Sequence, residues 1–200
     1  MDFSTKEVRT VAGTNIQSAD KEGGKPGVEQ PLASPWDVCL AHSPTSNEPD
    51  LLVIANAGTH QIWGLALRNL TWWKKLQVES GTCFRLAGSG AEENRNNSYP
   101  AKAAFAQPSG LCSATLQTRS DEYLLFVADS ESSSIRQVNL NDGSVKALVG
   151  GDKDPMVTLM TEHHFFYTKL IPLTIFRIYF ALAIKIMIAI QKAQSCFSIL

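Results

Sequence analysis

The sequence has little of what marks several large classes of protein. Its net charge is −1 over 200 residues, so no basic surface is expected to bind nucleic acid. The first residues contain no apolar run of the kind that forms the centre of a secretory signal peptide. There are only four cysteines, and no two of them have CxxC or metal-type spacing. A disulfide framework is therefore not expected, and a reducing compartment, the cytosol, fits the composition better.

Patterns that carry catalysis or hold a cofactor are also missing. His60 has no second histidine or carboxylate at a useful spacing, and Glu162-His163-His164 has no second cluster that would complete a metal site. Gly88-Ser89-Gly90 and Gly150-Gly151 follow apolar runs, but they precede no helix and lack the lysine of a phosphate-binding loop. These glycines indicate turns. We therefore expect no enzyme activity, no metal and no cofactor.

A stretch of 31 residues occurs twice. Residues 32–62 and 105–135 align without a gap at an offset of 73, and nine aligned residues are identical. Each copy contains two apolar strands, a tight turn rich in Asn, Asp or Ser, and the start of a third strand; a fourth strand then ends at a glycine. Such spacing predicts an antiparallel meander, and four strands per repeat predict one blade of a β-propeller. The expected strands are Trp36–Cys39, Leu51–Ala55, one starting at Ile62 and Phe84–Gly88, then Ser109–Cys112, Tyr123–Ala128, one starting at Ile135 and Lys146–Gly150.

The predicted fold is all-β, with two four-stranded propeller blades, one preceding strand and a hydrophobic helical tail. The preceding strand is expected within residues 6–16, because Val11-Ala12-Gly13-Thr14 resembles the end of a fourth strand. Two blades cannot close a propeller of roughly four to eight blades, so this would be part of a larger repeat domain. The expected divisions are 1–31 (strand and crossover loop), 32–88 (blade), 89–104 (crossover loop), 105–155 (blade) and 156–200 (tail).

Several motifs resemble those of the NHL-repeat family. Pro108-Ser109-Gly110 precedes an apolar strand, and Phe126–Ser130 (FVADS) is followed by Ile135-Arg136 and a closing glycine pair. Glu92–Asn97 (EENRNN), followed by Tyr99-Pro100, extends the match to about residues 5–156. The resemblance implies part of an NHL-type β-propeller that acts in the cytosol as a non-catalytic protein-interaction scaffold. It also implies a longer protein in which a thioredoxin-like domain, the propeller and a C-terminal β domain are joined.

One alternative is a redox-associated role inherited from that longer protein. The cysteine pair that the resemblance implies would belong to the thioredoxin-like domain, which this chain lacks. Cys39 and Cys112 are equivalent by repeat, so we expect two buried strand residues held well apart in adjacent blades. Cys83 and Cys196 have no partner in spacing. A thiol-exchange assay is expected to give no signal.

The tail after Asp154-Pro155 departs from the repeat. Leu170–Ile190 is 21 residues long, enough to span a bilayer as a helix. Pro172, Arg177 and Lys185 count against this, since a basic residue near the membrane centre costs about 2.5–3.5 kcal/mol. Three interpretations stay open for the tail: a membrane anchor, translated non-coding sequence, and ordinary protein core.

Two segments are candidates for contact with a protein partner. The crossover loop between the blades carries charged and amide side chains, and loops on a rigid scaffold commonly carry binding sites. An insertion in the first blade, Arg68–Ser80, places two tryptophans beside two lysines, a composition found in interface hot spots. The alternative for each is a solvated loop with one tryptophan folded onto the blade. The candidate contact residues are Glu92, Glu93, Asn94 and Arg95 in the loop and Trp72 and Trp73 in the insertion.

Overall fold

The computed structural model describes residues 4–43, 48–73, 76–116 and 122–150 of the chain. Nearly all of them lie in one compact unit, Met1–Leu148, whereas the second unit, Val149–Leu200, is almost entirely outside the described residues. The predicted helical tail, with Leu170–Ile190 and Glu162-His163-His164, falls in that undescribed part. Within the described part, no helix is long and apolar enough to cross a membrane.

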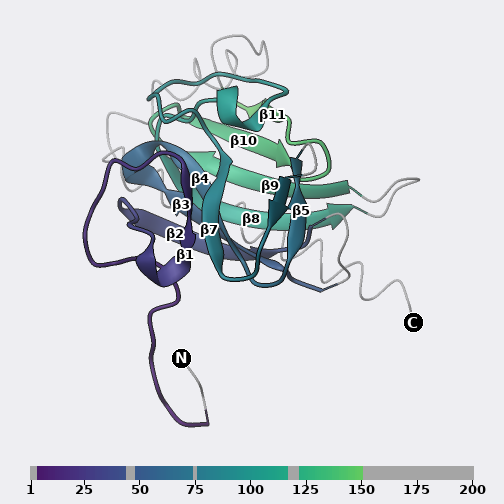
Figure 1. The fold of residues 1–200 in the computed structure, drawn as a ribbon. Helices are drawn as coiled ribbons and strands as arrows, with labels where there is room; N and C mark the ends of the chain where they lie inside the picture. The colour runs from purple at the N-terminus through teal and green to yellow at the C-terminus, as the bar shows by residue number, and fades with distance from the viewer. Residues whose placement is uncertain (1–3, 44–47, 74–75, 117–121, 151–200) are drawn as a thin grey trace. The chain divides into compact units, whose positions relative to one another are not determined.

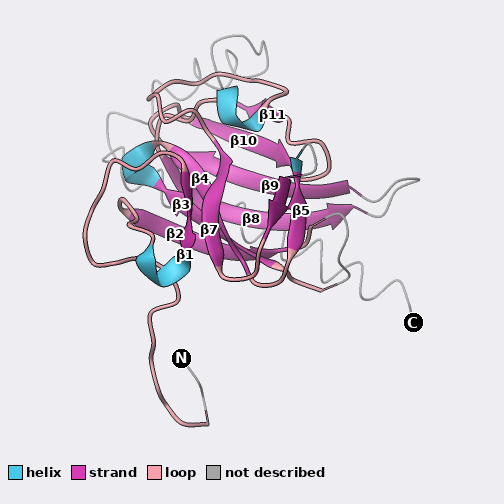
Figure 2. Ribbon diagram, in the orientation of Figure 1, coloured by secondary structure: helices cyan, strands magenta, loops and turns pink. Residues whose placement is uncertain are grey.

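The first unit contains two antiparallel meanders (Figures 1 and 2). The strand order is β1-β7-β4-β3-β2 in the first sheet and β11-β10-β9-β8 in the second, while β5 and β6 form a separate hairpin. The strands are β1 (Gly23–Pro26), β2 (Pro35–Ala41), β3 (Leu51–Asn56), β4 (Gln61–Ala66), β5 (Leu70–Trp72), β6 (Leu76–Val78), β7 (Thr82–Ala87), β8 (Pro108–Leu116), β9 (Glu122–Asp129), β10 (Ser134–Asn139) and β11 (Val145–Val149). Short 3-10 turns are η1 (Gly27–Glu29), η2 (Ala57–Thr59) and η4 (Pro100–Lys102). Within the described residues, the predicted β fold of antiparallel sheets is confirmed, and a strand is present at each of the eight predicted blade positions.

The strand register follows the repeat found in the sequence. In the first sheet Ala55 of β3 lies opposite Ile62 of β4. In the second sheet Ala128 of β9 lies opposite Ile135 of β10, the same pair at the offset of 73. Because a slip of one residue would turn every side chain to the other face of the sheet, the shared register places equivalent residues on equivalent faces of the two sheets. The face that enters the core between the sheets differs: the first sheet contributes Leu51 and Val53, whereas the second contributes Leu125 and Val127.

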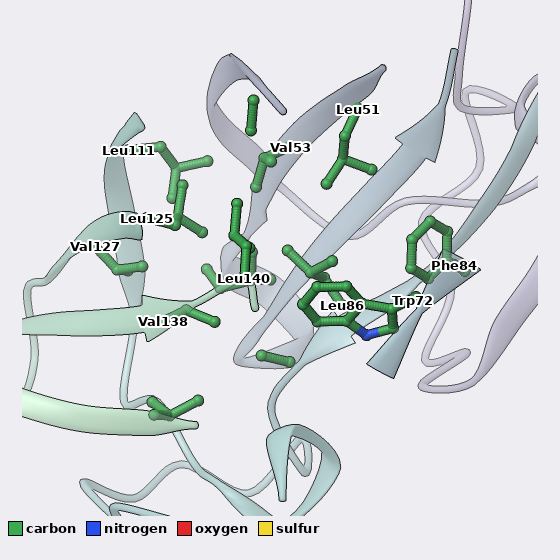
Figure 3. Close-up of a cluster of buried hydrophobic side chains, with 14 of the residues drawn as sticks. Leu51, Val53, Trp72, Phe84, Leu86, Leu111, Leu125, Val127, Val138 and Leu140 are labelled. Carbon is green, nitrogen blue, oxygen red and sulfur yellow. The ribbon is translucent and has the colours of Figure 1, made fainter. Parts of the chain in front are cut away.

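The main core lies between the two sheets. Apolar side chains of β3, β5 and β7 point toward those of β8, β9 and β10 (Figure 3). Burying each leucine or valine contributes about 1.5–3 kcal/mol, so contact between the sheets is a large part of what holds them together. The labelled members are Leu51, Val53, Trp72, Phe84, Leu86, Leu111, Leu125, Val127, Val138 and Leu140.

A smaller core covers the opposite face of the first sheet. Ala12 and Leu32, from the segment before β2, pack on it. Gly27 permits this approach, because a Cβ there would lie 2.5 Å from the Val11 carbonyl oxygen and 2.8 Å from Leu65 Cδ1. The buried residues of this second core are Ile54, Trp63, Leu65 and Cys83.

The preceding strand is not where the sequence predicted it. Residues 6–16 form no strand, whereas β1, in the stretch predicted to be a crossover loop, pairs with the outer strand β7. Gly23 lies opposite Phe84 and Pro26 opposite Thr82, so the first sheet has five strands instead of four. A strand needs a neighbour that accepts its backbone hydrogen bonds, and β7 offers its free edge to β1. Residues 11–14 resemble the end of a strand in sequence, but they pair with no neighbouring strand and therefore form none.

Candidate partner-binding surface

The backbone of the crossover loop 89–104 is fixed by hydrogen bonds on two sides. The Arg95 and Ala104 backbones exchange two bonds, with N···O distances of 3.3 and 3.0 Å. The Asn97 and Val145 backbones exchange two more, at 2.9 and 2.8 Å. The loop is therefore bonded both to the residues that lead into β8 and to the start of β11.

The side chains at the tip of this loop, residues 92–96, lie in solvent. Glu92, Glu93, Asn94 and Arg95 are all exposed. Arg95 Nη1 lies 3.0 Å from Glu93 Oε2, with 47% and 50% of the two side chains exposed. Such a pair contributes only about 0–1 kcal/mol, because solvent screens both charges. Arg95 Nε also donates to the Lys102 carbonyl oxygen at 3.1 Å, so the Arg95 guanidinium is attached to the loop on which it lies.

A buried arginine of the second blade holds the loop from beneath. The Arg136 side chain is fully buried. Its Nη1 donates to the Ala104 carbonyl oxygen at 2.8 Å, and its Nη2 donates to the Arg95 carbonyl oxygen and to Asn96 Oδ1, each at 3.0 Å. The fixed fork of a guanidinium can satisfy several acceptors at once. Arg136 was not among the predicted site residues.

The charge of Arg136 is balanced inside the blade. Arg136 Nη1 lies 3.6 Å from Asp129 Oδ2, and both side chains are fully buried. The guanidinium carbon lies 5.2 Å from the centre of the Phe105 ring. Burial lowers the pKa of Arg136, while the Asp129 carboxylate acts in the opposite direction. Asp129 also accepts the backbone N–H groups of Ala106 and Gln107, at 3.0 and 2.6 Å, so it is held as a turn residue.

His60 is a polar turn residue of the first blade, and its side chain also bonds to the backbone. It has a left-handed backbone with φ of 56°, and its repeat equivalent Ser133 has φ of 50°. The His60 ring Nδ1–H donates to the Ala106 carbonyl oxygen. The prediction that this position holds a polar turn residue bonded to the backbone is confirmed.

The insertion does not present its tryptophans as predicted. It forms the β5–β6 hairpin, in which Trp72 is only 5% exposed and belongs to the core between the sheets (Figure 3). Trp73 is half-buried and meets Tyr99 edge-to-face, with ring centres 5.5 Å apart. Trp72 is thus a core residue, and the alternative of a tryptophan folded onto the blade holds for it. The hairpin packs its apolar side chains Leu70, Trp72 and Val78 against the core between the sheets, because burial there removes them from water.

The three described cysteines form no disulfide with one another. Cys83 is buried, and burial raises its pKa to about 12, so its thiol is a poor nucleophile at neutral pH. Cys39 and Cys112 are half-buried, which corrects the expectation that both are buried. They lie on β2 and β8, the strands at one edge of each sheet, where cover by neighbouring strands is incomplete. In the described ranges, no group of three or more His, Cys, Asp or Glu side chains could hold a metal ion.

Comparison with known proteins supports the resemblance drawn from the motifs. No protein-family model matches the chain. The chain is 55% identical over 157 residues to NHL repeat-containing protein 2 of Homo sapiens, and 52% identical over the same length to that of Gallus gallus. It is 38% identical over 152 residues to Protein SUPPRESSOR OF QUENCHING 1, chloroplastic, of Arabidopsis thaliana.

The matches cover most of this chain but little of the relatives. They take in 78% of this chain for the two vertebrate proteins and 76% for the plant protein. The same alignments take in 21% of each vertebrate protein and 12% of the plant protein. The chain therefore corresponds to about a fifth of the length of its vertebrate relatives, and the predicted resemblance to NHL-repeat proteins is confirmed.

Proposed function

We propose that this NHL-repeat family member is a non-catalytic scaffold that binds a protein partner in the cytosol through its crossover loop. The observation that carries the proposal is the contrast within residues 92–96. Their side chains are exposed, while the backbone is bonded to Ala104 and, through Arg136, to the second blade. A loop that is already ordered loses little conformational entropy on binding, which favours affinity.

The chemistry of the loop indicates what kind of partner it would accept. Glu92 is exposed beside the Glu93–Arg95 pair, and Asn94 adds an amide between them. Carboxylate oxygens accept hydrogen bonds, so the partner would present arginine, lysine or backbone N–H groups. The overall charge of −1 supports a protein surface in preference to nucleic acid.

The non-catalytic part of the proposal rests on how the polar groups of the blades are used. Asp129 holds two backbone N–H groups, His60 holds a carbonyl oxygen, and Arg136 holds three acceptors. Each of these side chains completes the hydrogen bonding of a turn or loop. A general acid or base needs a proton that is free to move to a substrate, and these groups are engaged in structural bonds.

The test compares three forms of the full chain as bait in lysate of the source cells. The loop variant is Glu92→Ala/Glu93→Ala/Asn94→Ala, and the control is Glu7→Ala/Glu29→Ala, which removes exposed acidic residues elsewhere. Proteins are captured by chemical cross-linking and quantified by mass spectrometry. We expect proteins that bind wild type and control equally, with capture by the loop variant reduced roughly tenfold or more. The same set of proteins on all three baits would contradict the proposal.

A further inference from the structure

The two candidate contact segments meet at a pair of aromatic rings. Trp73 of the hairpin insertion meets Tyr99 of the crossover loop edge-to-face, with ring centres 5.5 Å apart. Trp73 is half-buried, whereas Tyr99 is 42% exposed. Tyr99 is therefore the more exposed ring of the pair, and it lies on the same loop as the exposed residues 92–96.

Tyr99 is held in place by its backbone and by its ring. Its N–H donates to Asn97 Oδ1 at 2.9 Å, and its carbonyl oxygen accepts the Lys102 backbone N–H at 2.9 Å. Trp73, which meets the ring, lies so close to Gly143 of the β10–β11 turn that a Cβ there would be 2.6 Å from Trp73 Cδ1. A ring fixed in this way supplies contact area to a partner and loses little conformational entropy on binding.

A chain of contacts joins Tyr99 to the acidic end of the loop. Lys102 Nζ lies 5.4 Å from the centre of the Tyr99 ring. The Lys102 carbonyl oxygen accepts a hydrogen bond from Arg95 Nε at 3.1 Å, and Arg95 Nη1 pairs with Glu93 Oε2 at 3.0 Å. Glu92 precedes Glu93 in the loop. The acidic residues, Lys102 and Tyr99 therefore belong to one continuous surface.

Two charges of opposite sign on this surface have no ion-pair partner among the described residues. They are the Glu92 carboxylate and the Lys102 ammonium, and both side chains are exposed. The charges of Glu93 and Arg95, by contrast, balance each other. A partner of complementary charge would bring a basic group to Glu92 and a carboxylate to Lys102.

We propose that Tyr99 is the apolar anchor of the partner surface and that Lys102 beside it binds a carboxylate of the partner. The partner places an apolar side chain on the Tyr99 ring and an aspartate or glutamate next to it. Tyrosine is among the residue types that dominate the affinity of protein interfaces. This inference rests on the proposed function, to which it adds an anchoring residue and the charge pattern of the partner.

The test extends the capture experiment to four further variants of the full chain. Tyr99→Ala removes the ring, Tyr99→Phe keeps it, and Lys102→Glu reverses the charge beside it. The matched control is Lys6→Glu, which makes the same charge change at an exposed lysine outside the loop. We expect capture to fall roughly tenfold or more with Tyr99→Ala and with Lys102→Glu. Capture by Tyr99→Phe and Lys6→Glu should stay within about twofold of the wild type.

A second measurement tests the charge pairing on the wild-type chain, so it does not depend on the folding of any variant. A carbodiimide joins an amine to a carboxylate only where the two groups are in contact. Peptide mass spectrometry of the cross-linked complex should find Lys102 joined to an aspartate or glutamate of the captured protein. Lys6, which is exposed but lies outside the loop, should give no such product.

The outcomes separate this inference from the proposed function. Loss of capture with the triple variant at residues 92–94 but not with Tyr99→Ala overturns the anchor and leaves the proposed function standing. Loss with Tyr99→Ala but not with the triple variant does the reverse. A captured complex without a cross-link from Lys102 overturns the carboxylate contact, and equal capture by every variant overturns both proposals.

Discussion

The two blades build the same turn with different charges. Asn56 of the first blade and Asp129 of the second occupy the same repeat position. Asn56 Oδ1 accepts the Ala33 backbone N–H at 2.8 Å, and Asp129 Oδ2 accepts the N–H of the equivalent Ala106 at 3.0 Å. The turn thus requires an oxygen acceptor at this position, and either a neutral amide or a carboxylate meets that requirement.

What differs is the residue seven positions after the acceptor. The first blade has Trp63 where the second has Arg136. Trp63 Nε1 donates to Gln61 Oε1 at 3.0 Å, and its ring belongs to the small core under the N-terminal segment. Arg136 balances the Asp129 charge and reaches the crossover loop. Both blades therefore share the same strands and turn. They differ at the Asn56/Asp129 and Trp63/Arg136 positions, where the first blade packs on the N-terminal segment and the second bonds to the crossover loop.

The largest difference between the blades should follow from removing the buried cation. Arg136→Ala leaves Asp129 charged without its partner and removes the donor from the Ala104 and Arg95 carbonyl oxygens. We expect a loss of about 3–5 kcal/mol in the free energy of unfolding, measured by urea denaturation. The control is Arg68→Ala, which breaks the exposed pair with Glu48 and should cost less than about 1 kcal/mol. Similar losses in both variants would show that the buried pair has no special weight.

The next difference concerns two leucines that are equivalent by repeat. Leu125 is fully buried between the sheets, whereas Leu52 is half-buried on the opposite face of the first sheet. Leu125→Ala should lower the free energy of unfolding by about 3 kcal/mol, because it leaves a cavity in a packed core. Leu52→Ala should lower it by about 1 kcal/mol, since solvent can fill the space. Thermal and urea unfolding of both variants measure this, and an equal cost would contradict a core placed between the blades.

A third substitution gives the first blade the charge of the second without its cation. Asn56→Asp buries a carboxylate in a blade that has Trp63 in place of Arg136, and it should cost about 2 kcal/mol at neutral pH. Burial without a cation raises the pKa of the new carboxyl in the folded state, so folding favours the protonated form. The cost should therefore shrink as pH falls toward the pKa of the unfolded chain. Urea denaturation of variant and wild type at each pH measures the difference, and a cost that does not change with pH would show that charge is not its cause.

The smallest effect concerns the thiols. The pKa of Cys83 is raised from 9.0 to about 12 by burial, so the folded protein keeps this proton at pH values where the unfolded chain loses it. Its contribution to stability is complete below pH 9 and falls as pH rises from there toward 12. Iodoacetamide at pH 8.5, followed by peptide mass spectrometry, should label Cys39 and Cys112 well before Cys83. Early labelling of Cys83 would place it outside the core.

Features that depend on residues close by in the sequence could be predicted from it. Alternating apolar residues and Asn, Asp or Ser turns predicted the eight blade strands, and the equivalence of His60 with Ser133 predicted a polar turn at both positions. Trp72 was harder, since a tryptophan beside lysines fits an exposed loop as well as a hairpin folded onto a core. Only the presence of an apolar surface next to the hairpin separates the two, and that surface is formed by residues of both sheets, which only folding brings together.

The sequence by itself determined the repeat, the four-strand blade and the turn positions, because these depend on side-chain alternation and turn chemistry within a few residues. The tertiary structure decided which segment pairs with β7, where Trp72 is buried, and what Arg136 holds. Arg136 bonds to the backbone of Arg95, 41 residues away, and the sequence around it shows only an arginine at the start of a strand. The role of Arg136 depends on the Ala104 and Arg95 carbonyl oxygens, which only the folded chain places beside it, so no local sequence pattern predicts that role.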